Sequence, residues 1–332
     1  MFRAEVIGCG IGGACAALAL AKVGAAVTVY ERSERAADVG GWVTLGPAAS
    51  TALDQIGLGE KVRAAGFPVV GVSSVDTLTG RTKSFARTEP GHRWSSIHVW
   101  RRDLLAVLRE GLDGANIPCA YGTRADPSKR TGDLLVGADG ARSETRRMLG
   151  SSQELAYTGQ VIRYGHCPVP VRGLPTNVLH FWAHSEGVAG YVGDERDGSF
   201  WFSRRKAASP STAIDADVLL EMLRATQVAE VLEHSEVSAP IALYELEPDG
   251  LWHSADTVLI GDAAHAVSPA AGRGATSAIE DAIVLAKTLR GANSIATALE
   301  SYTRTRRPIA QATYRPRSVR QPPQVSAADL RL

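Results

Sequence analysis

The 332-residue chain carries 36 Lys and Arg against 35 Asp and Glu, which gives a formal net charge of +1. This balance excludes the electrostatic footprint of a nucleic-acid-binding protein or of a protein held on an anionic membrane. With 45% hydrophobic and 21% charged residues, the chain has the composition of a globular enzyme and the length of about two domains.

The N-terminal segment predicts a phosphate-binding turn. Residues 2–7 form a short apolar strand pattern, and the next six, GCGIGG at 8–13, complete G-x-G-x-x-G. In this order Gly8 permits a tight turn, Gly10 lets the backbone approach a pyrophosphate, and Gly13 lets the following helix pack on the strand. A second strand at 25–30 ends at Glu31, where a carboxylate can bind a ribose hydroxyl. The segment therefore predicts an adenine dinucleotide site rather than a signal peptide or membrane span.

The middle of the chain alternates between helix and strand patterns. A glycine-rich loop at 40–50 leads into a helix at 50–58, weak strand patterns cover 69–86, and helical periodicity runs from about Arg102 to Leu112. The block DLLVGADGARSETRRML at 133–149 predicts a strand that ends at Asp139-Gly140, followed by a basic helix. Further patterns are strand-rich and aromatic at 160–205, helical at 214–232 and strand-like at 239–247.

The block VLIGDAAHAVSPAAGRGA at 258–275 predicts a strand that delivers Asp262 to its carboxyl end, followed by a glycine-flanked helix start. A carboxylate there can accept hydroxyl hydrogen bonds, and bare helix amides can hold negative charge. We expect His265 to stabilise this loop by a hydrogen bond. The last helix spans about 294–313, with Arg304, Arg306 and Arg307 expected on a solvated face or at a helix-end contact.

The four cysteines (Cys9, Cys15, Cys119 and Cys167) have no metal-binding spacing. We therefore expect no metal site and a reduced, cytoplasmic protein. The βα patterns lie at both ends of the chain and the aromatic strands lie between them, so one domain is expected to be inserted within the other.

Taken together, the blocks at 8–13, 133–146 and 261–275 resemble the FAD-dependent aromatic hydroxylases, single-component flavoprotein monooxygenases related to p-hydroxybenzoate and salicylate hydroxylases. The resemblance implies an α/β fold with a Rossmann-like FAD-binding domain, three-layered around a mostly parallel sheet, and an inserted substrate domain with a mixed β-sheet. The expected boundaries are 1–68, 93–155 and 248–315 for the FAD-binding domain, 69–92 and 156–247 for the substrate domain, and 316–332 for a loose tail. The interval 121–133 is shorter than the β-meander usual in that family.

The resemblance also implies the cofactor contacts. Glu31 would hold the adenosine ribose, Arg101 the phosphate or ribityl region, and Asp262 the ribityl and pyrophosphate region of FAD. The helix start from Gly272 to Ala275 would place amides beside the flavin pyrimidine ring. The full set of expected cofactor residues is Gly8, Gly10, Ile11, Gly12, Gly13, Glu31, Arg32, Arg101, Asp139, Gly261, Asp262, Gly272, Gly274 and Ala275.

Substrate contacts are expected from the strand-rich segment and from the loops near the flavin. Because strands alternate, His180, Trp182 and His184 share one face, which lines either the pocket or the packed side of the sheet. The candidates are Trp42, His180, Trp182, Tyr191, Trp201, Pro269 and Arg273. Arg273 is expected either to pair with an acidic substrate group or to be a solvated loop residue.

The implied activity is that of an NAD(P)H-dependent FAD monooxygenase, with NADPH or NADH as reductant. It inserts one oxygen atom from O₂ into an aromatic or polycyclic small molecule through a flavin C4a-hydroperoxide. Because the flavin carries the chemistry, no catalytic side chain is named. The alternatives are an FAD-dependent oxidoreductase without oxygen insertion, or a non-catalytic flavin- or ligand-binding protein. A flavin halogenase is disfavoured because the chain has no W-x-W-x-I-P segment. We expect a monomer or homodimer, with natural-product tailoring as a plausible role.

Overall fold

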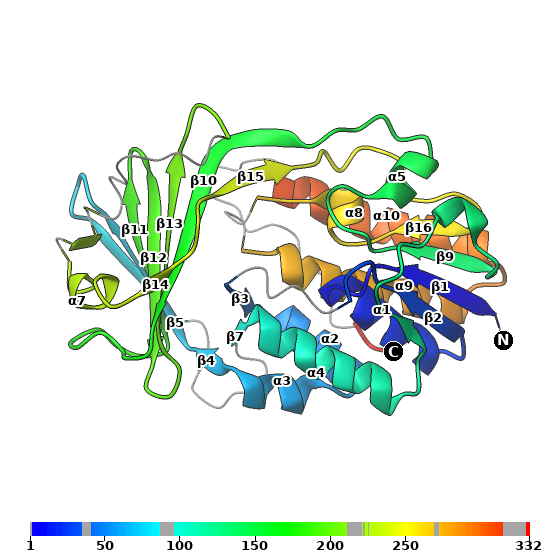
Figure 1. Cartoon of the computed structure of the whole chain (residues 1–332), viewed down its shortest axis with the longest axis horizontal. Coiled ribbons are helices and arrows are strands. Elements are labelled where there is room, and N and C mark those ends of the chain that lie inside the picture. The colour runs from blue at the N-terminus through cyan, green and yellow to red at the C-terminus, as the bar shows by residue number, and fades with distance from the viewer. Residues whose placement is uncertain are drawn as a thin grey trace. The chain divides into compact units, whose positions relative to one another are not determined.

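The computed structural model describes residues 2–34, 41–86, 96–210, 221, 223–224, 226–268, 272–314 and 330–332. The chain divides into two compact units, which are coloured by residue number in Figure 1. The first consists of Met1–Gly66, Val99–Ala156 and Tyr244–Leu332, and the second of Phe67–His98 and Tyr157–Leu243. The chain therefore leaves the first unit twice and returns to it twice.

The first unit is built on a five-stranded sheet in the order β16–β9–β1–β2–β8, and its strand pairs are parallel. All the strands of this sheet therefore end at the same edge, and the loops that carry the sequence motifs follow there. The strands are β1 (Arg3–Ile7), β2 (Ala26–Tyr30), β8 (Cys119–Ala120), β9 (Leu134–Gly137) and β16 (Thr257–Leu259).

Helices of the first unit pack on this sheet and on one another, with α1 between α9 and α4 and with α10 against α9. Small residues allow the close approach of α1 and α9, because a Cβ added to Gly12 would stand 3.2 Å from the Cβ of Ala278. The helices are α1 (Ile11–Lys22), α2 (Pro47–Gln55), α3 (Gly59–Ala65), α4 (Arg101–Gly114), η1 (Pro127–Lys129), α5 (Glu144–Met148), α8 (Asp262–His265), α9 (Gly274–Gly291) and α10 (Ile295–Tyr314).

Two short elements lie where the sequence predicts only loop. The strand β3 (Trp42–Leu45) lies within the glycine-rich segment 40–50, and α8 is a single turn directly after Gly261. Both are too short to produce a periodic pattern, and flanking glycines give the same signal as a loop. The expectation of an unstructured connection was therefore wrong at these two places.

The second unit holds a mixed sheet in the order β14–β10–β13–β12–β11–β5–β6, in which β5 and β11 are parallel and β10–β13, β12–β13 and β11–β12 are antiparallel. The elements of this part are β4 (Phe67–Val69), β5 (Gly71–Asp76), β6 (Thr82–Ala86), β7 (Ser96–Trp100), β10 (Ala156–Cys167), β11 (Val178–His184), β12 (Gly187–Asp194), β13 (Gly198–Lys206), α7 (Ala229–Leu232), β14 (Glu236–Val237) and β15 (Ile241–Glu245). A parallel sheet in one unit and a mixed sheet in the other confirm the predicted fold class.

One face of this second sheet forms the hydrophobic core of its unit. Trp182, Tyr191 and Trp201 come from three neighbouring strands and are all buried, together with Val228 and Val231 at α7. The ring of Trp201 lies across Gly165 of β10, where an added Cβ would stand 2.1 Å from the ring. Its indole Nε1 donates to Ser235 Oγ over 2.8 Å. The alternation of β13 thus points its largest side chain into the core.

The expected tail at 316–332 lies outside the described residues up to residue 329. Of the last three residues, Leu330 is buried, and the amide of Leu332 donates to Gln55 Oε1 over 3.0 Å. In the described part of the chain, no helix combines the length and the hydropathy that a membrane span requires.

Replacement of the Trp201 side chain tests this core. Trp201→Ala removes a fully buried ring and leaves a cavity beside Gly165, so the free energy of unfolding should fall by about 3–5 kcal/mol. Leu78→Ala in the same unit is the control, because Leu78 is 69% exposed. Urea unfolding followed by circular dichroism measures both variants, and equal midpoints would contradict the placement of Trp201 in the core.

Candidate functional site

The three sequence motifs meet at the carboxyl edge of the parallel sheet. The amide of Ala138, which follows β9, donates to the carbonyl oxygen of Ile7 over 2.8 Å. Gly8 has a φ of +101°, and a Cβ at this position would stand 2.3 Å from the carbonyl oxygen of Ala138. Only glycine fits there. The glycine turn is therefore packed directly against the block around Asp139.

Gly10 and Gly13 have opposite surroundings at the start of α1. A Cβ on Gly13 would stand 1.9 Å from the carbonyl oxygen of Gly8, whereas a Cβ on Gly10 would meet no atom within 4 Å. No side chain caps α1, so the first amides of the helix, at Ile11 and Gly12, lack intrahelical partners. Open space beside uncapped helix amides is suited to an anion.

The carboxylate of Glu31 lies beside this turn. Its Oε2 accepts a hydrogen bond from the amide of Cys9 at 2.8 Å, and its Oε1 accepts one from the amide of Ser33 at 2.9 Å. Each carboxylate oxygen can accept more than one hydrogen bond. Glu31 therefore keeps capacity for a hydroxyl donor, and the neighbouring Arg32 is exposed.

Asp262 opens the single turn α8, directly after Gly261. The residue is exposed to solvent, yet desolvation by the surrounding chain raises the pKa of its carboxyl, against the opposing charges of His265 and Arg101. The exposed Arg101 side chain is close enough to act on it electrostatically.

Two hydrogen bonds flank β3, one to the start of α4 and one to the first turn of α9. The amide of Arg101 donates to the carbonyl of Gly41 over 3.2 Å, and the amide of Gly46 donates to Thr276 Oγ1 over 3.2 Å. The strand between these two glycines, β3, contacts both α4 and α9. No side chain caps α9, so its first amides, at Gly274 and beyond, present the positive end of the helix dipole.

Trp42 belongs to a small aromatic cluster in the same region. Its ring meets that of Trp100 edge to face, with centroids 6.1 Å apart, and the guanidinium of Arg102 lies 4.6 Å from the Trp100 centroid. These contacts hold the Trp42 side chain next to the start of α4.

Asp281 of α9 is fully buried and holds three elements together. Its Oδ2 accepts a hydrogen bond from the amide of Gly261 at 2.8 Å and pairs with Nε2 of His265 at 2.7 Å. Its Oδ1 accepts from Nε of Arg306 on α10 at 2.6 Å, and Arg306 also donates to Glu280 over 2.8 Å. The loop that presents Asp262 is therefore held by a buried charge network.

The pKa directions follow from this pairing. Burial would raise the pKa of the Asp281 carboxyl, but the charges of His265 and Arg306 hold that pKa well below its usual range. Burial would lower the pKa of His265, but the charge of Asp281 and its hydrogen bond raise it instead. Both directions favour the ionised carboxylate beside the protonated imidazole. The expectation that His265 stabilises its loop by a hydrogen bond is confirmed.

Unlike the other predicted cofactor residues, Asp139 has a carboxylate that caps a helix of the protein. Its two carboxylate oxygens accept hydrogen bonds from the amides of Glu144 and Thr145 and from the hydroxyl of Ser143, at 2.6–3.0 Å. The carboxylate thus caps the start of α5. From this helix the buried Arg146 donates to the carbonyl of Ala263 over 3.0 Å. Asp139 therefore acts on the Asp262 loop through α5.

A model of the FAD binding domain family matches residues 120–316. Kynurenine 3-monooxygenase of Salinispora tropica is 30% identical over an alignment of 357 positions. This alignment covers 92% of this chain and 76% of that protein. The chain belongs to the FAD-dependent monooxygenase family. Aurachin C monooxygenase/isomerase of Stigmatella aurantiaca is 28% identical over 329 residues, 91% of this chain and 84% of that one. The structure of Klebsiella pneumoniae HpxO complexed with FAD and uric acid shares the fold, with a TM-score of 0.77 and 23% identity over 94% of this chain and 86% of that one.

In this monooxygenase four of the expected substrate residues point into protein. His180 stacks on Trp182 with ring centroids 6.2 Å apart and approaches Tyr191 at 6.0 Å, while Trp182, Tyr191 and Trp201 belong to the core of the second unit. Desolvation lowers the pKa of His180, as expected for a buried imidazole. The shared face of His180 and Trp182 is thus the packed face, which corrects the expectation that these four side chains line a substrate pocket.

Arg306 is buried and paired with Asp281 and Glu280, so its placement on a solvated face was wrong. Arg273 donates to Glu280 at 3.4 Å, and its pairing with an acidic substrate group stays a prediction. Pro269 lies outside the described residues. Sequence reasoning missed Asp281 and Arg146, and the only signal was an acidic pair, Glu280-Asp281, inside an otherwise apolar helix pattern.

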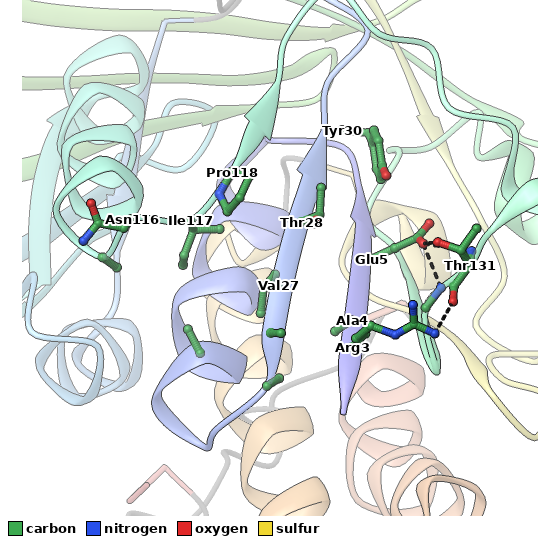
Figure 2. Close-up of a pocket in the computed structure, with 15 residues that line it drawn as sticks. Arg3, Ala4, Glu5, Val27, Thr28, Tyr30, Asn116, Ile117, Pro118 and Thr131 are labelled. Atoms are coloured by element: carbon green, nitrogen blue, oxygen red, sulfur yellow. Dashed lines mark hydrogen bonds between the residues drawn. The ribbon is translucent and has the colours of Figure 1, made fainter. Parts of the chain in front are cut away.

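A groove of about 520 Å³ lies at the amino ends of β1 and β2, with Thr131 and Gly132 in its lining (Figure 2). Glu5 accepts hydrogen bonds there from the amides of Thr131 and Gly132 over 2.8 Å. Thr28 is the partner of Glu5 in the β1–β2 register, and Asn116 lies on the other side of β2. None of the predicted cofactor residues lines this groove. Among the described residues, no three His, Cys, Asp or Glu side chains are grouped for a metal ion.

Neutralising Asp281 tests the buried network. Asp281→Asn leaves the buried positive charges of Arg306 and His265 without the carboxylate that they share. The free energy of unfolding should therefore fall by about 3–5 kcal/mol. The affinity for FAD should fall as well, because the loop that presents Asp262 loses the hydrogen bonds of Gly261 and His265 to the Asp281 carboxylate. The exposed Glu300→Gln on α10 is the control. Urea unfolding and fluorescence titration with FAD measure both effects, and a variant as stable as the control would refute the role of Asp281.

The same network predicts a pH dependence. A raised His265 pKa stabilises the fold below the unfolded value of about 6.5, and a depressed Asp281 pKa stabilises it above about 3.9. The stability gap between the native chain and His265→Gln should therefore be largest between these values and shrink as the pH rises through the His265 pKa. Urea unfolding at several pH values measures the gap, and a gap that widened with rising pH would contradict the ion pair.

Proposed function

We propose that this protein is a monooxygenase that inserts one oxygen atom from O₂ into an aromatic or polycyclic small molecule, with FAD as cofactor and NADPH or NADH as reductant. The single observation that carries the proposal is the convergence of Gly10, Glu31 and Asp262 at one edge of the parallel sheet in a member of this family. The relatives named for kynurenine, aurachin C and uric acid support a ring-containing substrate.

The residues present fit FAD. The open space at Gly10 and the uncapped amides of α1 would take the pyrophosphate, and Glu31 would accept a hydrogen bond from the adenosine ribose. Arg101, whose charge acts on Asp262, and Asp262 itself would contact the ribityl chain and the phosphates. The supporting positions are Gly8, Ile11, Gly12, Gly13, Arg32, Asp139, Gly261, Gly272 and Ala275.

The bound flavin supplies electron transfer from the nicotinamide and the activation of O₂. The chain supplies position and charge. The uncapped start of α9 presents roughly half a positive charge, which stabilises negative charge on a ring placed against Gly274 and Ala275. Thr276 and Gly46 fix this helix start through their hydrogen bond. Asp281 keeps the Asp262 loop at its place through Gly261 and His265.

Purification with added FAD tests the function. The expected results are a yellow protein, oxidation of NADPH or NADH that a ring-containing compound stimulates, and a product heavier by one oxygen atom that carries ¹⁸O from ¹⁸O₂. Flavin reduction without label in any product would favour an oxidoreductase without oxygen insertion. Failure to bind FAD would refute both, and it would favour a non-catalytic binding protein.

Gly10→Val tests the pyrophosphate site separately from the fold. Gly10 has a φ of −76° and a ψ of −172°, which any residue adopts, and its Cβ position is open. The variant should therefore unfold at the native urea concentration and yet bind FAD more weakly by at least about tenfold, equivalent to about 1.4 kcal/mol.

The matched control is Gly114→Ala at the end of α4, where an added Cβ also meets nothing. Fluorescence titration gives the FAD affinity of both variants. Native affinity in Gly10→Val would mean that the pyrophosphate does not lie at this turn.

A further inference from the structure

Two of the four cysteines lie together beside the glycine turn. Cys9 is the second residue of GCGIGG and is buried. Cys119 begins β8, which is separated from β1 by β2 in the sheet, and it is partly exposed. The Cys119 side chain makes hydrogen bonds with the Cys9 thiol and with the Tyr121 hydroxyl. That hydroxyl stands 3.9 Å from the Cys9 sulfur. The fold thus brings two free thiols from distant parts of the sequence into contact.

Glu31 links the segments that carry these two thiols. Its carboxylate accepts a hydrogen bond from the amide of Cys9 over 2.8 Å. Its own amide donates over 3.0 Å to the carbonyl of Ala120, the residue that follows Cys119. The thiol pair therefore lies next to the carboxylate that would hold the adenosine ribose of FAD.

The cofactor contacts proposed above use the backbone of the turn, the amides of α1 and the Glu31 carboxylate, and neither sulfur atom takes part in them. Among the described residues, no further His, Cys, Asp or Glu side chain joins the pair as a third metal ligand. Two adjacent thiols without a third ligand are suited to disulfide formation rather than to holding a metal ion.

We propose that Cys9 and Cys119 form a site of reversible oxidation, at which hydrogen peroxide joins the two sulfurs in a disulfide and thereby weakens FAD binding at the glycine turn. The partly exposed Cys119 attacks one peroxide oxygen, the O–O bond breaks, and a sulfenic acid and one water result. Cys9 then attacks the Cys119 sulfur, the S–S bond forms, and the sulfenic oxygen leaves as a second water. The two sulfurs lose two electrons in total, the peroxide gains them, and both thiol protons end in water.

The disulfide acts on FAD through the position of the turn. It holds its two sulfurs about 2.0 Å apart, closer than a hydrogen bond between thiols, so its formation pulls Cys9 toward β8. This displacement acts on the Cys9 amide and on its hydrogen bond to Glu31, and the turn that would hold the pyrophosphate moves with it. Linkage makes the effect reciprocal, so bound FAD opposes the disulfide.

Burial keeps both thiols protonated at neutral pH. It raises the pKa of Cys9 to about 11, where the charges of Cys119 and Glu31 act in the same direction and that of Arg109 on α4 acts against them. It also raises the pKa of Cys119, and the charge of Asp113 adds to this effect. The hydrogen bonds of both thiols oppose these shifts. Because the thiolate is the reacting form, the pair should react slowly at neutral pH and faster as the pH rises.

Oxidation of the full chain tests the proposal. The protein is treated with hydrogen peroxide at neutral and at alkaline pH, with and without FAD, and the remaining free thiols are alkylated. Mass spectrometry of a digest made without reductant identifies the joined peptides, and fluorescence titration gives the FAD affinity before oxidation, after it and after dithiothreitol. The variants are Cys119→Ala and the control Cys167→Ala, which removes a thiol from the core of the second unit.

Peroxide should join the peptides of Cys9 and Cys119, and the joined pair should be lighter by two hydrogen atoms than the two reduced peptides together. The reaction should be faster at alkaline pH and slower with FAD bound. The oxidised chain should bind FAD about tenfold more weakly or worse, and dithiothreitol should restore the affinity. Cys119→Ala should keep its FAD affinity after the same treatment, whereas Cys167→Ala should lose affinity as the native chain does.

Any of three results overturns the proposal. They are the absence of a joined Cys9–Cys119 peptide after sustained treatment, a disulfide that leaves the FAD affinity unchanged, and an equal loss of affinity in Cys119→Ala. None of these measurements uses a nicotinamide, O₂ or a substrate, so their outcome is independent of the tests of oxygen insertion.

Discussion

The arrangement of the first unit depends on one buried carboxylate. Asp281 is removed from water in the interior of α9, and an unpaired charge there would be destabilising by several kcal/mol. Its two oxygens must therefore find donors, and they find the amide of Gly261, the imidazole of His265 and the guanidinium of Arg306. These donors come from a loop and from another helix, so satisfying one carboxylate fixes the position of both.

Small residues provide the second constraint on the same region. Ala278 on α9 meets Gly12 of α1 and Gly261 of the Asp262 loop, with 3.2 and 3.1 Å between its Cβ and an added Cβ on each. Any larger side chain at these three places would push the glycine turn and the Asp262 loop apart. Charge pairing and close packing thus act on the same loop from two sides, and together they preorganise the position of Asp262.

A residue's role could be predicted from the sequence where it follows from the conformation and close packing of its own backbone. Gly8 and Gly13 are required by positive φ and by close approach, so the motif spacing alone identified them. The core position of Trp201 was not predictable in the same way, because alternation shows which strand residues share a face but not which face another element covers. Arg306 was misplaced for a related reason: helical periodicity does not distinguish an arginine that meets water from one that meets Asp281. That distinction depends on a partner distant in the sequence.

The contact between Gly12 and Ala278 also has a consequence for how the protein is made. The glycine turn is among the first segments to be synthesised, and its packing partner lies near the other end of the chain. Long-range contacts of this kind form late, because the intervening chain must be ordered before they become favourable. During synthesis, the cofactor-binding edge of the sheet therefore stays incomplete until β16, α9 and α10 have been made. A chain that stopped before Ala278 would have every residue of the glycine turn and would lack its packing partner on α9.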